Sequence, residues 1–218
     1  MEDFTEFEQI ETFMENRDIA RAKDMREFGI SGTAISRATA EGILIRLSRG
    51  IYTKSDANMD ASFQLAEIAK RYPDGVICLV SALSFYGVTD QLPTQIWLAI
   101  ENKAWKPKSD FPKIRAVRFR EPYYSGAVSR HSISNIDVPF YTLEKTLADA
   151  FRNPKLVDRS VAIEALKNTL AEKKSTPAKI AEAAKTYSAW KKMAPYLCLL
   201  YTSPSPRDRT RSRMPSSA

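Results

Sequence analysis

The apolar residues at the start of the chain recur at helical spacing. Within residues 4–15 they stand at Phe4, Phe7, Ile10, Phe13 and Met14. This period places them on one face and predicts a first amphipathic helix over residues 4–15. A second short helix is predicted over residues 18–28, with Asp18 as its N-terminal cap.

A glycine separates the second predicted helix from a third. Gly29 is free to take the positive φ that a tight turn needs. Ser31 is a good N-cap for a helix over residues 32–40, and Gly42 ends that helix. Two short helices that meet at a tight turn are the central part of a helix-turn-helix motif.

A β-hairpin is predicted directly after the third helix. Residues 43–47 and 51–53 have the composition of two strands, joined by a turn at residues 48–50. The hairpin would be the wing, so residues 1–54 are predicted to form a winged helix-turn-helix domain.

The following residues predict a second, mixed domain over residues 60–197. Its first expected element is a helix over residues 61–72, and residues 76–80 fit either a buried strand or the start of a helix through Tyr86. Strands are expected at residues 96–100, 114–119, 123–124 and 138–141, and helices from residue 142 to residue 200 with breaks at Pro154 and Pro177. The fold class is therefore α+β, with a small sheet and C-terminal helices.

The end of the chain differs from the rest in composition. Residues 198–218 are rich in Ser, Pro and Arg, and this tail is expected to be disordered because it has too little apolar surface to fold. The string from about Cys198 also resembles translated sequencing adapter, in which case the natural C-terminus, beyond about Leu197, would be missing. Its arginines are therefore not counted as evidence for DNA binding.

Charge is distributed unevenly along the chain. The net charge is +7, and residues 17–54 contribute +4 (eight Lys/Arg, four Asp/Glu) while residues 103–131 contribute +6 (eight against two). Such basic stretches are compatible with a nucleic-acid partner. The chain shows neither an apolar run of membrane length nor the order of a signal peptide, and its two cysteines are far apart. We expect a cytoplasmic protein without a membrane partner, a metal or another cofactor.

The third helix carries the candidate DNA-reading side chains. In a winged helix-turn-helix its N-terminal residues face the base edges of the major groove, here Thr33, Ser36 and Arg37, with Thr39 behind. Arg37 is the only strong base-reading side chain, because its guanidinium can bind guanine bidentately. The backbone N–H groups near Ser31 suit a phosphate.

The wing adds Arg46, Arg49 and Tyr52, which we expect to contact mostly phosphates. A three-helix module with a hairpin used only for protein contacts remains the alternative. Three further arginines alternate along the predicted strand of residues 114–119 and just beyond it: Arg115, Arg118 and Arg120. They fit an extended DNA footprint, a contact with an acidic surface of a protein partner or a plain exposed edge equally well.

Three motifs in this order resemble the AbiEi family, the antitoxins and autoregulators of type IV abortive-infection toxin–antitoxin systems. The wing sequence Arg-Gly-Ile-Tyr at residues 49–52 is similar to the family's wing. Residues 76–100 contain its Ser-Ala-Leu and Trp-Leu-Ala-Ile progression, and residues 142–150 contain its Glu-Lys-Thr-Leu-Ala-Asp helix.

The resemblance implies a bacterial antitoxin without catalytic activity. It would bind inverted repeats of double-stranded DNA in its own promoter through the winged domain and repress transcription. Its C-terminal domain would counteract, directly or functionally, a nucleotidyltransferase toxin of the AbiEii type. A plain transcriptional regulator without a toxin is one alternative.

A nuclease is the other alternative. Pro73-Asp74 followed by Glu101-Asn102-Lys103 resembles the PD-ExK signature, in which carboxylates hold Mg²⁺ and the lysine orients a water molecule. Asp74, however, stands in a Pro-Asp-Gly turn, whereas the signature needs its Asp on a strand.

The predicted helix that begins near residue 142 carries a group of charged residues. Lys145 and Asp149, four residues apart, are expected to form an exposed ion pair on a solvated face that also holds Glu144. A toxin-facing or domain-docking surface is the alternative.

Overall fold

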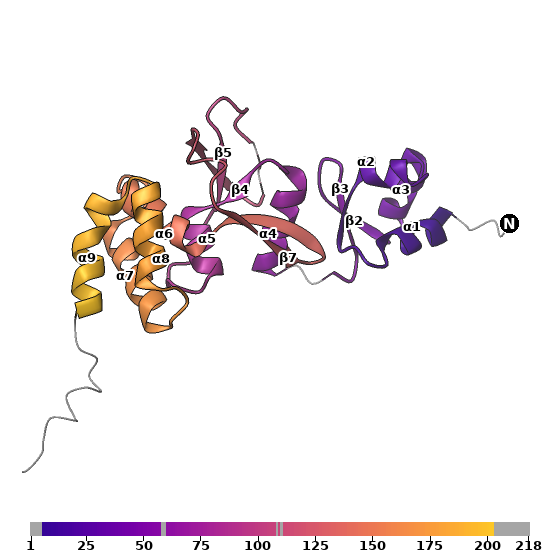
Figure 1. The fold of residues 1–218 in the computed structure, drawn as a ribbon. Helices are drawn as coiled ribbons and strands as arrows, with labels where there is room; N and C mark the ends of the chain where they lie inside the picture. The colour runs from indigo at the N-terminus through magenta and orange to yellow at the C-terminus, as the bar shows by residue number, and fades with distance from the viewer. Residues whose placement is uncertain (1–5, 58–59, 108, 110, 203–218) are drawn as a thin grey trace, which may run out of the picture. The chain divides into compact units, whose positions relative to one another are not determined.

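The computed structural model describes residues 6–57, 60–107, 109 and 111–202 (Figure 1). It confirms the α+β class. The chain divides into two compact units, Met1–Ile77 with Thr94–Phe140 and Cys78–Pro93 with Tyr141–Ala218. The domain boundary predicted between residues 54 and 60 falls inside the first unit and stays a prediction. None of the helices in the described part of the chain is long and apolar enough to cross a membrane.

The N-terminal part of the first unit is a winged helix-turn-helix. Its elements are α1 (Glu6–Met14), β1 (Ile19–Arg21), α2 (Ala22–Glu27), α3 (Gly32–Ala40), β2 (Leu44–Ser48) and β3 (Ile51–Lys54). The three strands form an antiparallel sheet in the order β1-β3-β2. The third helix occupies the predicted residues 32–40, and Gly29 before it has a φ of +104°.

The second helix is shorter than predicted, and its expected Asp18 cap is wrong. Residues 19–21 form β1, in which Ile19 lies opposite Thr53. The side chains of Ile19 and Ala20 are buried, and backbone pairing with β3 makes this segment a strand rather than the start of a helix. A strand of three residues is too short to show a period in the sequence.

The helices of this part enclose an apolar core. The core residues are Ile10, Phe13, Met14, Ala20, Met25, Ile30, Ala34, Ile35, Ala38 and Leu44. The inner face of α3 supplies three of them, at residues 34, 35 and 38. Burial of this face fixes which side of α3 is turned outward.

The rest of the first unit is a helix and a five-stranded mixed sheet. Its elements are α4 (Ala61–Arg71), β4 (Val76–Ile77), β5 (Ile96–Glu101), β6 (Ile114–Phe119), β7 (Val128–Ile133) and β8 (Ile136–Tyr141). The strand order is β6-β5-β4-β8-β7, with β4 antiparallel to β5 and β5 parallel to β6.

One expected strand in this part was wrong, and one observed strand was not expected. Tyr123 and Tyr124 lie in turns rather than in a strand, and β7 was not foreseen. Exposed and half-buried residues alternate along β7, which stands at an edge of the sheet. Its polar composition therefore gave no strand signal. The ambiguous residues 76–80 form both a short strand and the start of the next helix.

The second unit is built from helices in its described residues. They are α5 (Leu79–Phe85), α6 (Leu143–Arg152), α7 (Arg159–Ala171), α8 (Pro177–Thr186) and α9 (Trp190–Thr202). In Figure 1, α6 to α9 form the orange and yellow group of helices. The predicted breaks at Pro154 and Pro177 are confirmed, and a further break precedes Trp190. α9 includes residues 198–202 of the predicted tail, and residues 203–218 lie outside the described residues.

Helix α6 is the centre of this unit, and its predicted exposed ion pair is instead buried. α6 contacts α5, α7, α8 and α9. The Lys145 Nζ lies 2.6 Å from Asp149 Oδ2, and both side chains are 0% exposed. Arg152 Nη2 lies 2.6 Å from the other oxygen of Asp149. The expectation of a solvated helix face was wrong, because neighbouring helices cover the side of α6 that carries these residues.

Candidate nucleic-acid interface

The N-terminus of α3 has the capping expected from the sequence. The Ser31 Oγ accepts a hydrogen bond from the Ala34 N–H at 3.0 Å. The Thr33 Oγ1 lies 2.8 Å from the same hydroxyl. The cap satisfies one of the N–H groups that a helix start leaves without a partner. Ser31 thus has a structural role at this position, and a phosphate contact there stays a prediction.

This cap gives a first testable prediction. Replacing Ser31 by Ala should lower the free energy of unfolding by about 1 kcal/mol, because the Ala34 N–H loses its acceptor. Thermal unfolding followed by circular dichroism measures the change. Ser31→Asp is the matched variant, since Asp also caps a helix, and it should restore most of the loss. Equal stability of Ser31→Ala and the native chain would contradict this account of the cap.

Helix α3 presents one exposed stripe on the side away from the core. The stripe consists of Thr33, Ser36, Arg37 and Ala40. Their spacing of three and four residues places them on one face. Thr39 is half-buried, and its hydroxyl donates to the Ile35 carbonyl at 2.8 Å. Of the residues predicted to face DNA on this helix, Thr33, Ser36 and Arg37 thus lie together and Thr39 does not.

The guanidinium of Arg37 is engaged by α1. Its Nη1 lies 2.9 Å from the Glu6 Oε2, and its Cζ lies 5.7 Å from the centre of the Phe7 ring. The Arg37 and Glu6 side chains are 63% and 48% exposed, so this is a surface ion pair of small energy. Sequence reasoning missed Glu6 because it stands 31 positions away from Arg37.

The wing places two arginines at the surface and one tyrosine on the core. Arg46 in β2 and Arg49 in the turn are exposed. Gly50 has a φ of +76°, which allows the tight reversal between β2 and β3. Tyr52 lies opposite Arg46 but is half-buried and packs against the apolar core. The predicted wing residues therefore divide into two exposed cations and one mainly structural aromatic.

The arginines of β6 do not form a single surface. The Arg115 guanidinium lies 4.0 Å from the centre of the Trp97 ring. Arg118 donates to the Ala104 carbonyl at 3.2 Å. Arg115 and Arg118 differ by an odd number of positions, so they project from opposite faces of the strand. Arg120 follows β6 and is exposed.

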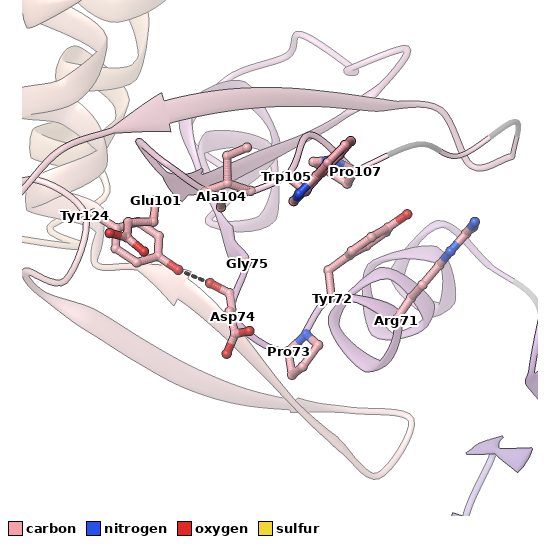
Figure 2. A pocket seen from close by; sticks show the side chains of 11 residues that line it. Arg71, Tyr72, Pro73, Asp74, Gly75, Glu101, Ala104, Trp105, Pro107 and Tyr124 are labelled. Atoms are coloured by element: carbon pink, nitrogen blue, oxygen red, sulfur yellow. Dashed lines mark hydrogen bonds between the residues drawn. The ribbon is translucent and has the colours of Figure 1, made fainter. Parts of the chain in front are cut away.

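The residues of the PD-ExK-like pattern meet only in part. Asp74 and Glu101 line the same cavity, which Figure 2 shows, but Lys103 is not among the residues that line it. Asp74 lies in a turn before β4. In the described part of the chain, no three side chains of His, Cys, Asp or Glu gather closely enough to hold a metal ion.

Comparison with known proteins found a family model that matches the winged domain. Residues 8–53 match the family model described as "Transcriptional regulator, AbiEi antitoxin". A search of curated protein sequences gave no match. Among solved structures, the crystal structure of the RV2827C protein from Mycobacterium tuberculosis is similar, with 14% sequence identity and a TM-score of 0.63. The similarity covers 90% of this chain and 78% of that one, and at this identity it speaks for the fold alone.

The matched residues contain all three helices and all three strands of the winged domain except the first two residues of α1 and the last residue of β3. The N-terminal part of the chain is therefore a winged helix-turn-helix whose residues 8–53 match the AbiEi antitoxin and transcriptional regulator domain.

Proposed function

We propose that the chain is a DNA-binding antitoxin without catalytic activity, which represses its own operon through the winged domain and counteracts a nucleotidyltransferase toxin of the AbiEii type. The observation that carries the proposal is the exposed stripe of α3 beside a wing with Arg46 and Arg49 at its surface. The family match at residues 8–53 supports the regulatory part. The proposal of a toxin partner rests on the sequence resemblance to the AbiEi family.

The two parts of the domain would contribute differently to DNA binding. The α3 stripe would enter the major groove, where Thr33 and Ser36 offer short polar contacts and Arg37 reads guanine. Arg46 and Arg49 would bind phosphates and set the register without reading sequence. Because α3 carries one strong base-reading side chain, the affinity of one copy would be modest, and inverted repeats would supply the rest through a second copy.

A gel-shift titration on the DNA upstream of the chain's own reading frame tests this proposal. We expect retarded complexes on DNA that contains the inverted repeats, and much weaker binding to a scrambled duplex of equal length at the same salt concentration. Log Kd should increase linearly with log salt, as it does for proteins that neutralise phosphates. Equal affinity for both duplexes at every salt concentration would contradict sequence-specific repression.

Glu6 gives a second prediction. Glu6→Gln should strengthen binding to the operator by up to a few-fold. In the native chain, Arg37 must break its ion pair with Glu6, worth about 0.2–1 kcal/mol, before it can bind DNA, and the variant has no such pair to break. Arg37→Ala should weaken binding to the operator by about 1–3 kcal/mol and relax the preference at one base pair. In the Arg37→Ala background, Glu6→Gln should lose most of its effect. An equal gain in both backgrounds would show that Glu6 acts by general repulsion of DNA.

The antitoxin part is tested in cells. The gene for the chain is co-expressed with a nucleotidyltransferase gene of the AbiEii type, which we expect beside it in the operon, and growth is measured. We expect the native chain to restore growth. A chain with Arg46→Ala and Arg49→Ala, expressed from an unrelated promoter, should also restore growth. Its expression does not depend on DNA binding by the wing, and the C-terminal domain that would neutralise the toxin is unchanged. Growth arrest in the presence of the native chain would contradict the antitoxin role and leave the regulatory role standing.

A further inference from the structure

The first unit contains a cavity of about 420 Å³ that shares no residue with α3 or the wing (Figure 2). It lies where α4, β5 and the segment after β6 approach one another. Its lining combines aromatic and acidic side chains: Tyr72, Asp74, Glu101, Trp105 and Tyr124. Neither the family match nor the proposed DNA contacts use these residues.

Aromatic rings form two sides of this cavity. Figure 2 shows the Trp105 indole and the Tyr72 ring on one side of the opening and Tyr124 on the other. Trp105 is 95% exposed, which is unusual for a large side chain that prefers to be at least partly covered. Exposed aromatic side chains at the mouth of a cavity are typical of binding sites.

Carboxylates lie at the Tyr124 end. Val76 pairs with Ala99 in the antiparallel ladder of β4 and β5, and continuing this register places Asp74 beside Glu101. The Tyr124 hydroxyl donates to the Asp74 backbone carbonyl. Burial raises the pKa of Tyr124, and the nearby charges of Asp74, Glu101 and Glu121 raise it further. Negative potential therefore gathers at this end of the cavity.

Among the described residues that line the cavity, the basic side chain is Arg71, and it is engaged at the rim. Arg71 Nη1 lies 2.9 Å from the Ser109 Oγ, and its Cζ lies 5.4 Å from the centre of the Tyr72 ring. Figure 2 shows the Arg71 guanidinium directed away from Asp74 and Glu101. The carboxylate end of the cavity thus suits an incoming cation.

We propose that this cavity binds an arginine side chain of a protein partner. A guanidinium is planar, stacks on Trp and Tyr faces, and presents a fork of N–H donors to carboxylates. The cavity lining offers both partners, the aromatic rings for stacking and the carboxylates of Asp74 and Glu101 for the N–H donors. A nucleotide would also stack, but its phosphate would be repelled by the two carboxylates. Arginine binding in this cavity would not depend on DNA binding by the winged domain.

The test is an NMR titration of the full chain with a short arginine peptide. The indole N–H signal of Trp105 is assigned by its loss in Trp105→Phe. The probe is acetyl-Gly-Arg-Gly-amide, and the matched peptide carries citrulline, which has the same shape without the charge. We expect a saturable shift of the Trp105 signal with a millimolar Kd for the arginine peptide, and a Kd about tenfold higher for the citrulline peptide.

Variants of the acidic residues complete the test. Glu101→Gln should raise the Kd of the arginine peptide about tenfold, while the nearby Lys103→Gln should leave it unchanged. The amide spectrum of each variant shows whether the chain is folded, and Asp74→Asn replaces Glu101→Gln if the latter is not. An unmoved Trp105 signal, equal binding of both peptides, or stronger binding of guanosine monophosphate than of the arginine peptide would overturn the proposal.

Discussion

Replacing Asp149 by Leu is expected to lower the free energy of unfolding of the second unit, which is built from helices, by about 3–5 kcal/mol. Asp149 is fully buried and pairs with both Lys145 and Arg152 at 2.6 Å. Without it, the buried ammonium of Lys145 loses this carboxylate, while the Tyr141 ring, 3.4 Å from its Nζ, and the Tyr187 ring stay beside it. Burial already lowers the pKa of Lys145, so loss of the Asp149 charge would further destabilise its charged form.

Removing the lysine of this ion pair should lower the free energy of unfolding less than removing the aspartate. Lys145→Met leaves Asp149 paired with Arg152, so we expect a smaller loss than for Asp149→Leu. The double variant Lys145→Met with Asp149→Leu removes both buried charges. It should be more stable than Asp149→Leu alone, because apolar side chains of similar size can replace a buried ion pair. Arg152, which is 16% exposed, then has access to water.

Urea unfolding followed by circular dichroism and by hydrogen exchange of the α6 amides measures these differences. Hydrogen exchange assigns the change to the helical unit, because the two units need not unfold together. The control is Lys167→Met, a lysine exposed on α7, which should change the free energy by less than about 0.5 kcal/mol. An Asp149→Leu chain as stable as the Lys167→Met chain would show that the pair does not stabilise the fold.

Replacing both Arg46 and Arg49 by Ala is expected to weaken all DNA binding by more than tenfold. Each phosphate contact is worth roughly fivefold at about 0.15 M salt, and each releases about 0.9 counterion. The slope of log affinity against log salt should therefore become smaller by about 1.8. Because phosphate contacts carry no sequence information, operator and scrambled DNA should lose affinity to a similar extent.

Fluorescence anisotropy over a series of salt concentrations measures this effect. Lys167→Ala is the control, since it removes one exposed charge outside the winged domain and should leave the slope unchanged. Tyr52→Phe is a second control, because its ring packs on the core and phenylalanine keeps that packing. If the double arginine variant keeps the native slope, the wing does not contact phosphates and the orientation proposed here is wrong.

Local signals in the sequence predicted the winged domain well. The Ser31 cap and the glycine after the helix define α3, and both act within a few residues of the helix ends. The hairpin with its turn at Gly50 was equally local. β1 was missed, because its three residues become a strand only by pairing with β3, whose partner residues lie thirty or more positions away.

The candidate DNA-binding side chains were found by the same local rules, but their surroundings were not. The helical period of α3 predicts that Thr33, Ser36 and Arg37 share a face. The ion pair between Arg37 and Glu6 needs the packing of α1 against α3 and could not be read from either segment alone. Likewise, Tyr52 counts as a wing residue in the sequence and as a core neighbour in the fold.

The sequence by itself determined the α+β class, the winged domain and the elements that have caps, turns or clear periodicity, because these signals depend on neighbouring residues. Only the tertiary structure decided which polar residues are buried and which distant residues meet. Lys145 and Asp149 have the spacing of an exposed pair, yet helices from distant parts of the chain cover them. Tyr72, Trp105 and Tyr124 come from three separate segments and line one cavity because the sheet brings those segments together.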